Sequence, residues 1–101
     1  MAVVERCIQS IPGGKWDEFM EWENKWMPVN KRLGMPPKRH YRALYASHDT
    51  STHVWEVEWA SLAELEATQT KMWADPEAQA LMAQWSTFVA REQRELYFLL
   101  P

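Results

Sequence analysis

The chain has 101 residues, of which 47% are apolar and 25% charged, and its formal net charge is −3. This length fits one domain spanning residues 1–101, and the ordinary apolar share excludes a wholly disordered chain. The acidic balance, with no basic run beyond Lys38-Arg39, argues against nucleic-acid binding.

The chain opens on a predicted strand at residues 3–11, in which β-branched and polar residues alternate before Pro12-Gly13-Gly14 ends it. Residues 15–30 then have the apolar spacing of a helix. The apolar arc of this helix holds Trp16, Phe19, Met20, Trp22, Trp26 and Met27. Glu23 falls inside the arc, so the pattern predicts a carboxylate on the buried side of the helix.

Two strands are predicted at residues 40–48 and 53–59, joined by a turn at residues 49–52. The second strand places His53, Trp55, Val57 and Trp59 on one face. Tyr41 and Tyr45 on the neighbouring strand are expected to join its two tryptophans in an aromatic patch. Such a patch serves either as core and dimer contact or as the lining of a pocket.

The remaining chain predicts an interrupted helix and a final strand. Ser61 and Glu64 form a capping box at the start of the helix, and Asp75-Pro76 interrupts it and can cap a new one. Residues 95–100 are the last strand. The order β-α-β-β-α-β predicts an α+β, ferredoxin-like domain with a four-stranded antiparallel sheet.

The last strand is apolar on both of its faces, because it contains Leu96, Tyr97, Phe98, Leu99 and Leu100. Helices on one side of the sheet can cover only one of these faces. A second copy of the chain would cover the other, so the pattern predicts a homodimer in which two sheets face each other.

Three segments carry a family resemblance: Glu5-Arg6 followed by Ser10-Ile11-Pro12-Gly13, the run from His53 to Glu64, and Trp73-Ala74-Asp75-Pro76-Glu77. They resemble the dimeric α/β-barrel proteins, most closely the NIPSNAP-like group, which is related to antibiotic-biosynthesis monooxygenases. The resemblance covers nearly the whole chain and implies a dimeric α/β barrel. Such folds include cofactor-free monooxygenases, haem-degrading enzymes, isomerases and proteins of unknown role, so the fold alone does not define the activity.

The composition also predicts a compartment. Cys7 is the only cysteine and cannot form an intramolecular disulfide, which fits a reducing compartment. The first residues lack the apolar run of a signal peptide, and no stretch is long enough to cross a bilayer. We therefore expect a cytoplasmic protein that is not bound to a membrane.

Arg6 and Glu23 are the candidate catalytic residues. If the first helix packs on the strand face that carries Arg6, the two groups meet in an aromatic cavity. Burying an ion pair in such a cavity costs free energy unless both groups are fully hydrogen-bonded. This cost favours a functional role for the pair, because perturbed charged groups cluster at functional sites. The alternative is a structural pair at the rim of a pocket.

His40, His48 and His53 belong to the predicted hairpin, and His48, His53 and Asp49 could approach each other at its turn. Their spacing matches no defined metal motif, so we expect a solvated hairpin end and no metal. Haem-degrading relatives hold iron with a histidine of the second helix. No histidine occurs between Ser61 and Arg94, which argues against that chemistry, and we expect no cofactor.

The seven tryptophans favour a protein that binds a small aromatic or hydrophobic molecule. The expected lining residues are Trp16, Trp26, Tyr41, Tyr45, Trp55, Trp59 and Trp85. If the protein is an enzyme, the family resemblance implies a cofactor-independent monooxygenase or an isomerase, in which Arg6 would stabilise a substrate anion. The alternative is a non-enzymatic structural or interaction dimer that uses its tryptophans for core and interface packing.

Overall fold

A computed structural model describes residues 1–44 and 49–101, so the predicted site residues Tyr45 and His48 lie outside the described residues. The elements follow the predicted β-α-β-β-α-β order, with the second helical region divided into pieces. They are β1 (Val3–Ser10), α1 (Trp16–Arg32), β2 (Arg39–Arg42), β3 (Thr52–Trp59), α2 (Leu62–Ala74), α3 (Pro76–Met82), α4 (Trp85–Phe88) and β4 (Arg91–Phe98).

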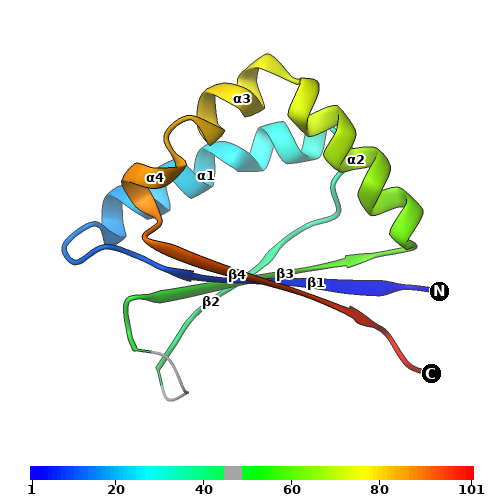
Figure 1. The fold of residues 1–101 in the computed structure, drawn as a ribbon, viewed down its shortest axis with the longest axis horizontal. Coiled ribbons are helices and arrows are strands. Elements are labelled where there is room, and N and C mark those ends of the chain that lie inside the picture. Colours follow the sequence, from blue (N-terminus) through cyan, green and yellow to red (C-terminus); the bar gives the residue numbers. More distant parts are fainter. Residues whose placement is uncertain (45–48) are drawn as a thin grey trace.

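The four strands form one antiparallel sheet in the order β2-β3-β1-β4. All of the helices lie on one face of this sheet, and the other face is open (Figure 1). This arrangement confirms the predicted ferredoxin-like α+β fold. Because β1 and β4 are antiparallel neighbours, both chain termini lie at the same end of the sheet (Figure 1).

The central strand β1 has one buried face. Val3, Glu5, Cys7 and Gln9 are buried beneath the helices, whereas Val4, Arg6 and Ile8 lie on the open face and are half-buried. Two charged or amide side chains therefore belong to the covered face of the sheet. Buried polar groups need hydrogen-bonding partners. The partners of Glu5 and Gln9 belong to the site described below.

Helix α1 packs its predicted arc on the sheet, with one exception. Phe19, Trp22 and Trp26 are buried, and Glu23 is buried among them, as the periodicity predicts. Met27 was expected on the same arc but is exposed, because the packed stripe continues through Val29 and Asn30 instead. The indole Nε1 of Trp22 donates a hydrogen bond of 3.0 Å to the Leu81 carbonyl and so ties α1 to α3.

The two helix starts predicted in the second helical region are confirmed. The Ser61 hydroxyl accepts a hydrogen bond from the Glu64 amide and caps α2. The Asp75 carboxylate accepts from the Ala78 amide and caps α3, with Pro76 in its first turn. Arg32 of α1 binds the same carboxylate with two hydrogen bonds of 2.8 and 2.9 Å, which lowers the pKa of Asp75 to about 2.

Two strands differ from their predicted limits. β4 begins at Arg91 rather than residue 95, because its first half is polar and lacks the apolar signal used to find it. β2 was predicted at residues 40–48 but is assigned only at Arg39–Arg42, and residues 45–48 lie outside the described chain.

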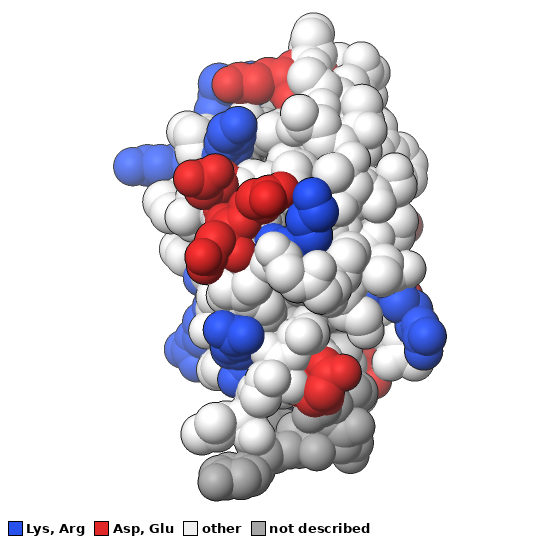
Figure 2. All heavy atoms as spheres, turned by 90° about the vertical axis from the view of Figure 1, so that its left-hand side faces the viewer, with Lys and Arg blue, Asp and Glu red and all other residues white. Residues whose placement is uncertain are grey.

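The end of the molecule that holds the start of α1 carries charges of both signs, with Lys and Arg interspersed among Asp and Glu (Figure 2). Neither sign of charge dominates the described part of this face. Within residues 1–44 and 49–101, no helix combines the length and apolar character that a bilayer crossing requires.

Candidate functional site

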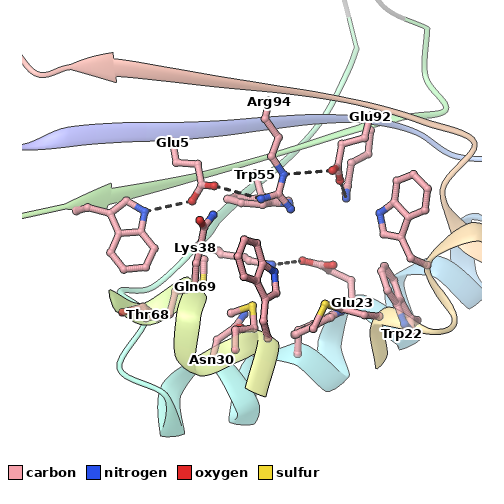
Figure 3. A pocket seen from close by; sticks show the side chains of 18 residues that line it. Glu5, Trp22, Glu23, Asn30, Lys38, Trp55, Thr68, Gln69, Glu92 and Arg94 are labelled. Atoms are coloured by element: carbon pink, nitrogen blue, oxygen red, sulfur yellow. Dashed lines mark hydrogen bonds and ion pairs between the residues drawn. The ribbon is translucent and has the colours of Figure 1, made fainter. Parts of the chain in front are cut away.

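A cavity of about 120 Å³ lies between the sheet and the helices. Six of the seven tryptophans line it, and only Trp16 does not. Side chains from both layers point toward one another across this space (Figure 3). The lining is formed by Glu5, Gln9, Trp22, Glu23, Trp26, Asn30, Met35, Lys38, Trp55, Trp59, Thr68, Gln69, Met72, Trp73, Met82, Trp85, Glu92 and Arg94.

Glu23 enters the cavity from α1 and pairs with Lys38, which lies just before β2. The Lys38 Nζ donates to Glu23 Oε1 over 2.8 Å, and the side chains are only 13% and 3% exposed respectively. The same Nζ lies 4.5 Å from the centre of the Trp55 ring, within the range of a cation–π interaction. The cavity thus contains a desolvated ion pair stacked on an indole (Figure 3).

The expectation that Arg6 meets Glu23 is wrong. Arg6 lies on the open face of the sheet, where its guanidinium binds Glu56 over 2.8 Å and approaches Glu95 at 3.6 Å. The hydrogen bond with Glu56 raises the pKa of Arg6. Both faces of β1 carry apolar and polar side chains, so alternation alone could not show which face the helix covers.

Arg94 of β4 occupies the place that Arg6 was expected to fill. Its Nε donates to Glu92 Oε2 over 3.2 Å, and its Nη1 lies 3.5 Å from Glu5 Oε2. The other Glu5 oxygen accepts a hydrogen bond of 3.2 Å from the Trp59 indole. The side chains of Glu5, Trp59, Glu92 and Arg94 thus form a hydrogen-bonded, charged group on the side of the sheet that faces the helices (Figure 3).

A chain of hydrogen bonds leads away from Glu92 toward the hairpin. Gln9 Nε2 donates to Glu92 over 2.9 Å, which leaves Gln9 Oε1 to accept from His53 Nδ1 over 3.0 Å. His53 Nε2 must then accept from His40 Nδ1, also at 3.0 Å. This series of hydrogen bonds therefore assigns one tautomer to each histidine and leaves the His40 Nε2 as an acceptor.

The pKa values of both histidines are lowered, although only His53 is fully buried and His40 lies in an exposed strand. The pKa of His53 falls to about 3, mainly because the ring is buried and further because the Lys38 ammonium, and His40 when it is protonated, disfavour another positive charge nearby. Burial also lowers the pKa of His40. Burial raises the pKa of the Cys7 thiol on the same sheet face, so this cysteine is a poor nucleophile.

Of the other expected site residues, Trp26, Trp55, Trp59 and Trp85 lie in the cavity lining. Trp16 lies outside it, against Phe19 and His53, with the Arg42 guanidinium 3.9 Å from its ring. Tyr41 pairs with Val54 on the open face and is exposed, so the expected patch of Tyr41 with Trp55 and Trp59 is wrong. Tyr45 is outside the described residues.

Sequence reasoning missed Lys38, Glu5, Glu92 and Arg94. Lys38 lies in a connector that follows no periodicity, and the other three lie on strand faces that the apolar pattern did not reveal. Among the described residues, no group of three or more His, Cys, Asp and Glu side chains is arranged to hold a metal ion.

The fold and this cavity define a class: a ferredoxin-like α+β domain with a tryptophan-lined site between its sheet and its helices. The model of one family, described as NIPSNAP, matches residues 9–101. The chain belongs to the NIPSNAP family. No curated protein matches it in sequence.

Solved structures of low sequence identity share the fold. A NIPSNAP family protein from Agrobacterium tumefaciens has a TM-score of 0.82 at 19% identity, covering 99% of this chain and 94% of its own. A NIPSNAP domain protein from Burkholderia xenovorans has a TM-score of 0.78 at 16% identity, covering 97% and 94%. A structure described as an antibiotic biosynthesis monooxygenase has a TM-score of 0.71 at 14% identity, covering 100% of both chains. This fold is therefore shared by NIPSNAP proteins and a monooxygenase-like protein.

Proposed function

We propose that this protein binds a small aromatic or hydrophobic molecule in the tryptophan-lined cavity. The observation that carries the proposal is an open space of about 120 Å³ surrounded by six indoles, where a core would be filled. An engineered cavity of about 150 Å³ in another protein binds benzene, so this volume fits a molecule of about one ring. Mostly apolar walls with a few convergent polar groups are typical of small-molecule sites.

The polar groups of the cavity favour an enzyme that moves a proton. Glu23 lies beside Lys38, and Glu92 lies beside Arg94, so each carboxylate that could remove a proton adjoins a cation that could stabilise the resulting anion. An isomerase returns the proton to a different atom of the substrate, and a cofactor-independent monooxygenase exposes the substrate anion to molecular oxygen. The antibiotic biosynthesis monooxygenase of the same fold supports the second reaction by analogy.

Ligand binding is tested by titrating single-ring aromatic compounds while following tryptophan fluorescence and thermal unfolding. We expect Trp85→Leu to weaken binding of any compound found by about tenfold, because the indole lines the cavity. Trp16→Leu is the matched control, since Trp16 lies outside the lining, and it should leave affinity unchanged. A broad panel that neither alters fluorescence nor raises the unfolding temperature would refute the proposal.

We also propose that the protein is a homodimer that buries the open face of the sheet, forming the dimeric α/β barrel. Leu96, Tyr97, Phe98, Leu99 and Leu100 at the end of the chain are all exposed in the single subunit. Tyr97 lies on the open face beside Val4, whereas Leu96 and Phe98 lie on the side that faces the helices, so apolar side chains are uncovered on both faces of this end of β4. Soluble monomers rarely leave large apolar surfaces uncovered. The same surface would suit the alternative function, a non-enzymatic interaction dimer, which differs in requiring no ligand in the cavity.

The dimer is tested by light scattering at micromolar concentration, where we expect twice the chain mass of 12.0 kDa. Tyr97→Lys should shift the protein toward monomer, because it places a charge on the open face of β4. Met27→Lys is the control, since Met27 is an exposed apolar residue on the helical layer. A wild-type protein that remains monomeric would contradict the proposal.

A further inference from the structure

The side chain of Asn30, which lines the cavity, carries a buried acceptor that no described residue satisfies. The side chain comes from α1, and the residue is only 7% exposed. Its Oδ1 accepts no hydrogen bond from residues 1–44 or 49–101. Buried polar atoms almost always have a partner, and each exception calls for an explanation. A bound molecule that carries an N–H or O–H group would supply the missing donor.

The charges of the cavity favour a donor that is also a cation. Three carboxylates, Glu5, Glu23 and Glu92, line it against two cations, Lys38 and Arg94, which leaves a net charge of −1. Both cations already bind carboxylates, at 2.8 Å for Lys38 and at 3.2 and 3.5 Å for Arg94. The nearby His53 adds no positive charge at neutral pH, because burial lowers its pKa. An entering anion would therefore meet an excess of negative charge.

The tryptophan walls favour the same class of ligand. The face of an indole attracts cations through its quadrupole, and clustered aromatic rings recognise organic ammonium groups. Lys38 and Arg94 already lie over the Trp55 ring, at 4.5 and 5.7 Å from its centre. The Trp22 ring already stacks on Phe88, with 5.5 Å between the ring centres, and Trp26 meets the Trp22 ring edge-on at 6.2 Å. Within residues 1–44 and 49–101, the rings of Trp59, Trp73 and Trp85 pack on no other aromatic ring or cation.

We infer that the natural ligand is a small organic ammonium compound, in which an N–H group donates to Asn30 Oδ1 and a compact apolar body of about one ring packs against the tryptophans. This inference rests on the proposed ligand-binding function and specifies its ligand class. The three supporting observations are independent: an unsatisfied buried acceptor, a net negative lining and an aromatic wall. The anion of an aromatic acid has no N–H or O–H group to donate to Asn30. An unsubstituted hydrocarbon would interact neither with the Asn30 acceptor nor with the net negative charge of the lining.

Four probes of nearly equal size separate this inference from the function on which it rests. Benzylamine is a cation at pH 7, benzyl alcohol a neutral donor, toluene an apolar ring and benzoate an anion. In calorimetric titrations of the whole chain, we expect benzylamine to bind at least about tenfold more tightly than each of the others. Benzoate, toluene or benzyl alcohol binding as tightly as benzylamine would overturn the ammonium inference and leave the binding function intact. Binding of none of the four would count against both.

A matched pair of variants tests the role of Asn30. Asn30→Leu removes the acceptor and should weaken benzylamine binding about tenfold while leaving toluene binding unchanged. Asn24→Leu makes the same change at an exposed position of α1 and should alter neither affinity. Thermal unfolding of each variant verifies that it is folded. If Asn30→Leu is folded and binds benzylamine as the wild type does, the inference fails; if it does not fold, the probe comparison on the wild-type chain decides.

Discussion

Replacing Lys38 by methionine is expected to lower the free energy of unfolding by about 3–5 kcal/mol. The change leaves the Glu23 carboxylate without its cation in a place where its side chain is only 3% exposed. A buried ion pair adds little net stability, but removing one partner leaves an uncompensated charge in a poorly solvated site. Urea unfolding of the wild type and the variant at pH 7 measures the difference.

Two further variants identify the cause of that loss. Lys38→Met combined with Glu23→Leu removes both charges and should recover most of the stability, because no unpaired carboxylate remains. Lys15→Met breaks the Lys15–Glu18 pair, whose N–O distance is 3.2 Å and whose side chains are 42% and 57% exposed, and should cost less than about 1 kcal/mol. If Lys38→Met is as mild as Lys15→Met, the pair with Glu23 is not desolvated in solution.

The same ion pair illustrates what the sequence could predict about the site. The helical period alone identified Glu23 as a carboxylate inside an apolar arc, and the structure confirms its burial. Its partner could not be found in this way. Lys38 follows two prolines in a connector, where side-chain direction depends on the path of the chain rather than on any period.

The strands show a second limit of sequence patterning. β3 could be oriented correctly because one face holds only buried side chains, including Trp55 and Trp59. The orientation of β4 could not be predicted in this way. Its inward residues include Glu92 and Arg94, and an apolar pattern assigns charged residues to the solvent side. Such inward charges are stable only with partners from other strands, and those partners depend on register. The fold was thus predictable from local signals, whereas the polar half of the site depends on tertiary pairing.

Lowering the pH from 7 to 5 is expected to reduce the free energy of unfolding by about 2 kcal/mol through His53 alone. Its pKa is about 3 in the folded chain and 6.5 in the unfolded chain. The unfolded state therefore binds more protons over this range, so stability falls as the pH drops below 6.5 and is fully present above it. Each pH unit below 6.5 costs about 1.4 kcal/mol until the folded pKa is approached. His40, whose pKa is also lowered by burial, adds in the same direction.

The pH range and the variants make this prediction specific to the histidines. Carboxylates titrate mainly below pH 5, and the pKa values of Glu92 and Asp75 are lowered further, so they add little to the change. His53→Asn cannot be protonated in this range and should lose most of the pH dependence, whatever its stability at pH 7. His40→Asn should keep most of it, because the more deeply buried ring remains. Equal stability of the wild type at pH 7 and pH 5 in urea unfolding would mean that His53 accepts a proton in the folded chain. The chain of hydrogen bonds from His40 through Gln9 to Glu92 would then need a different proton assignment.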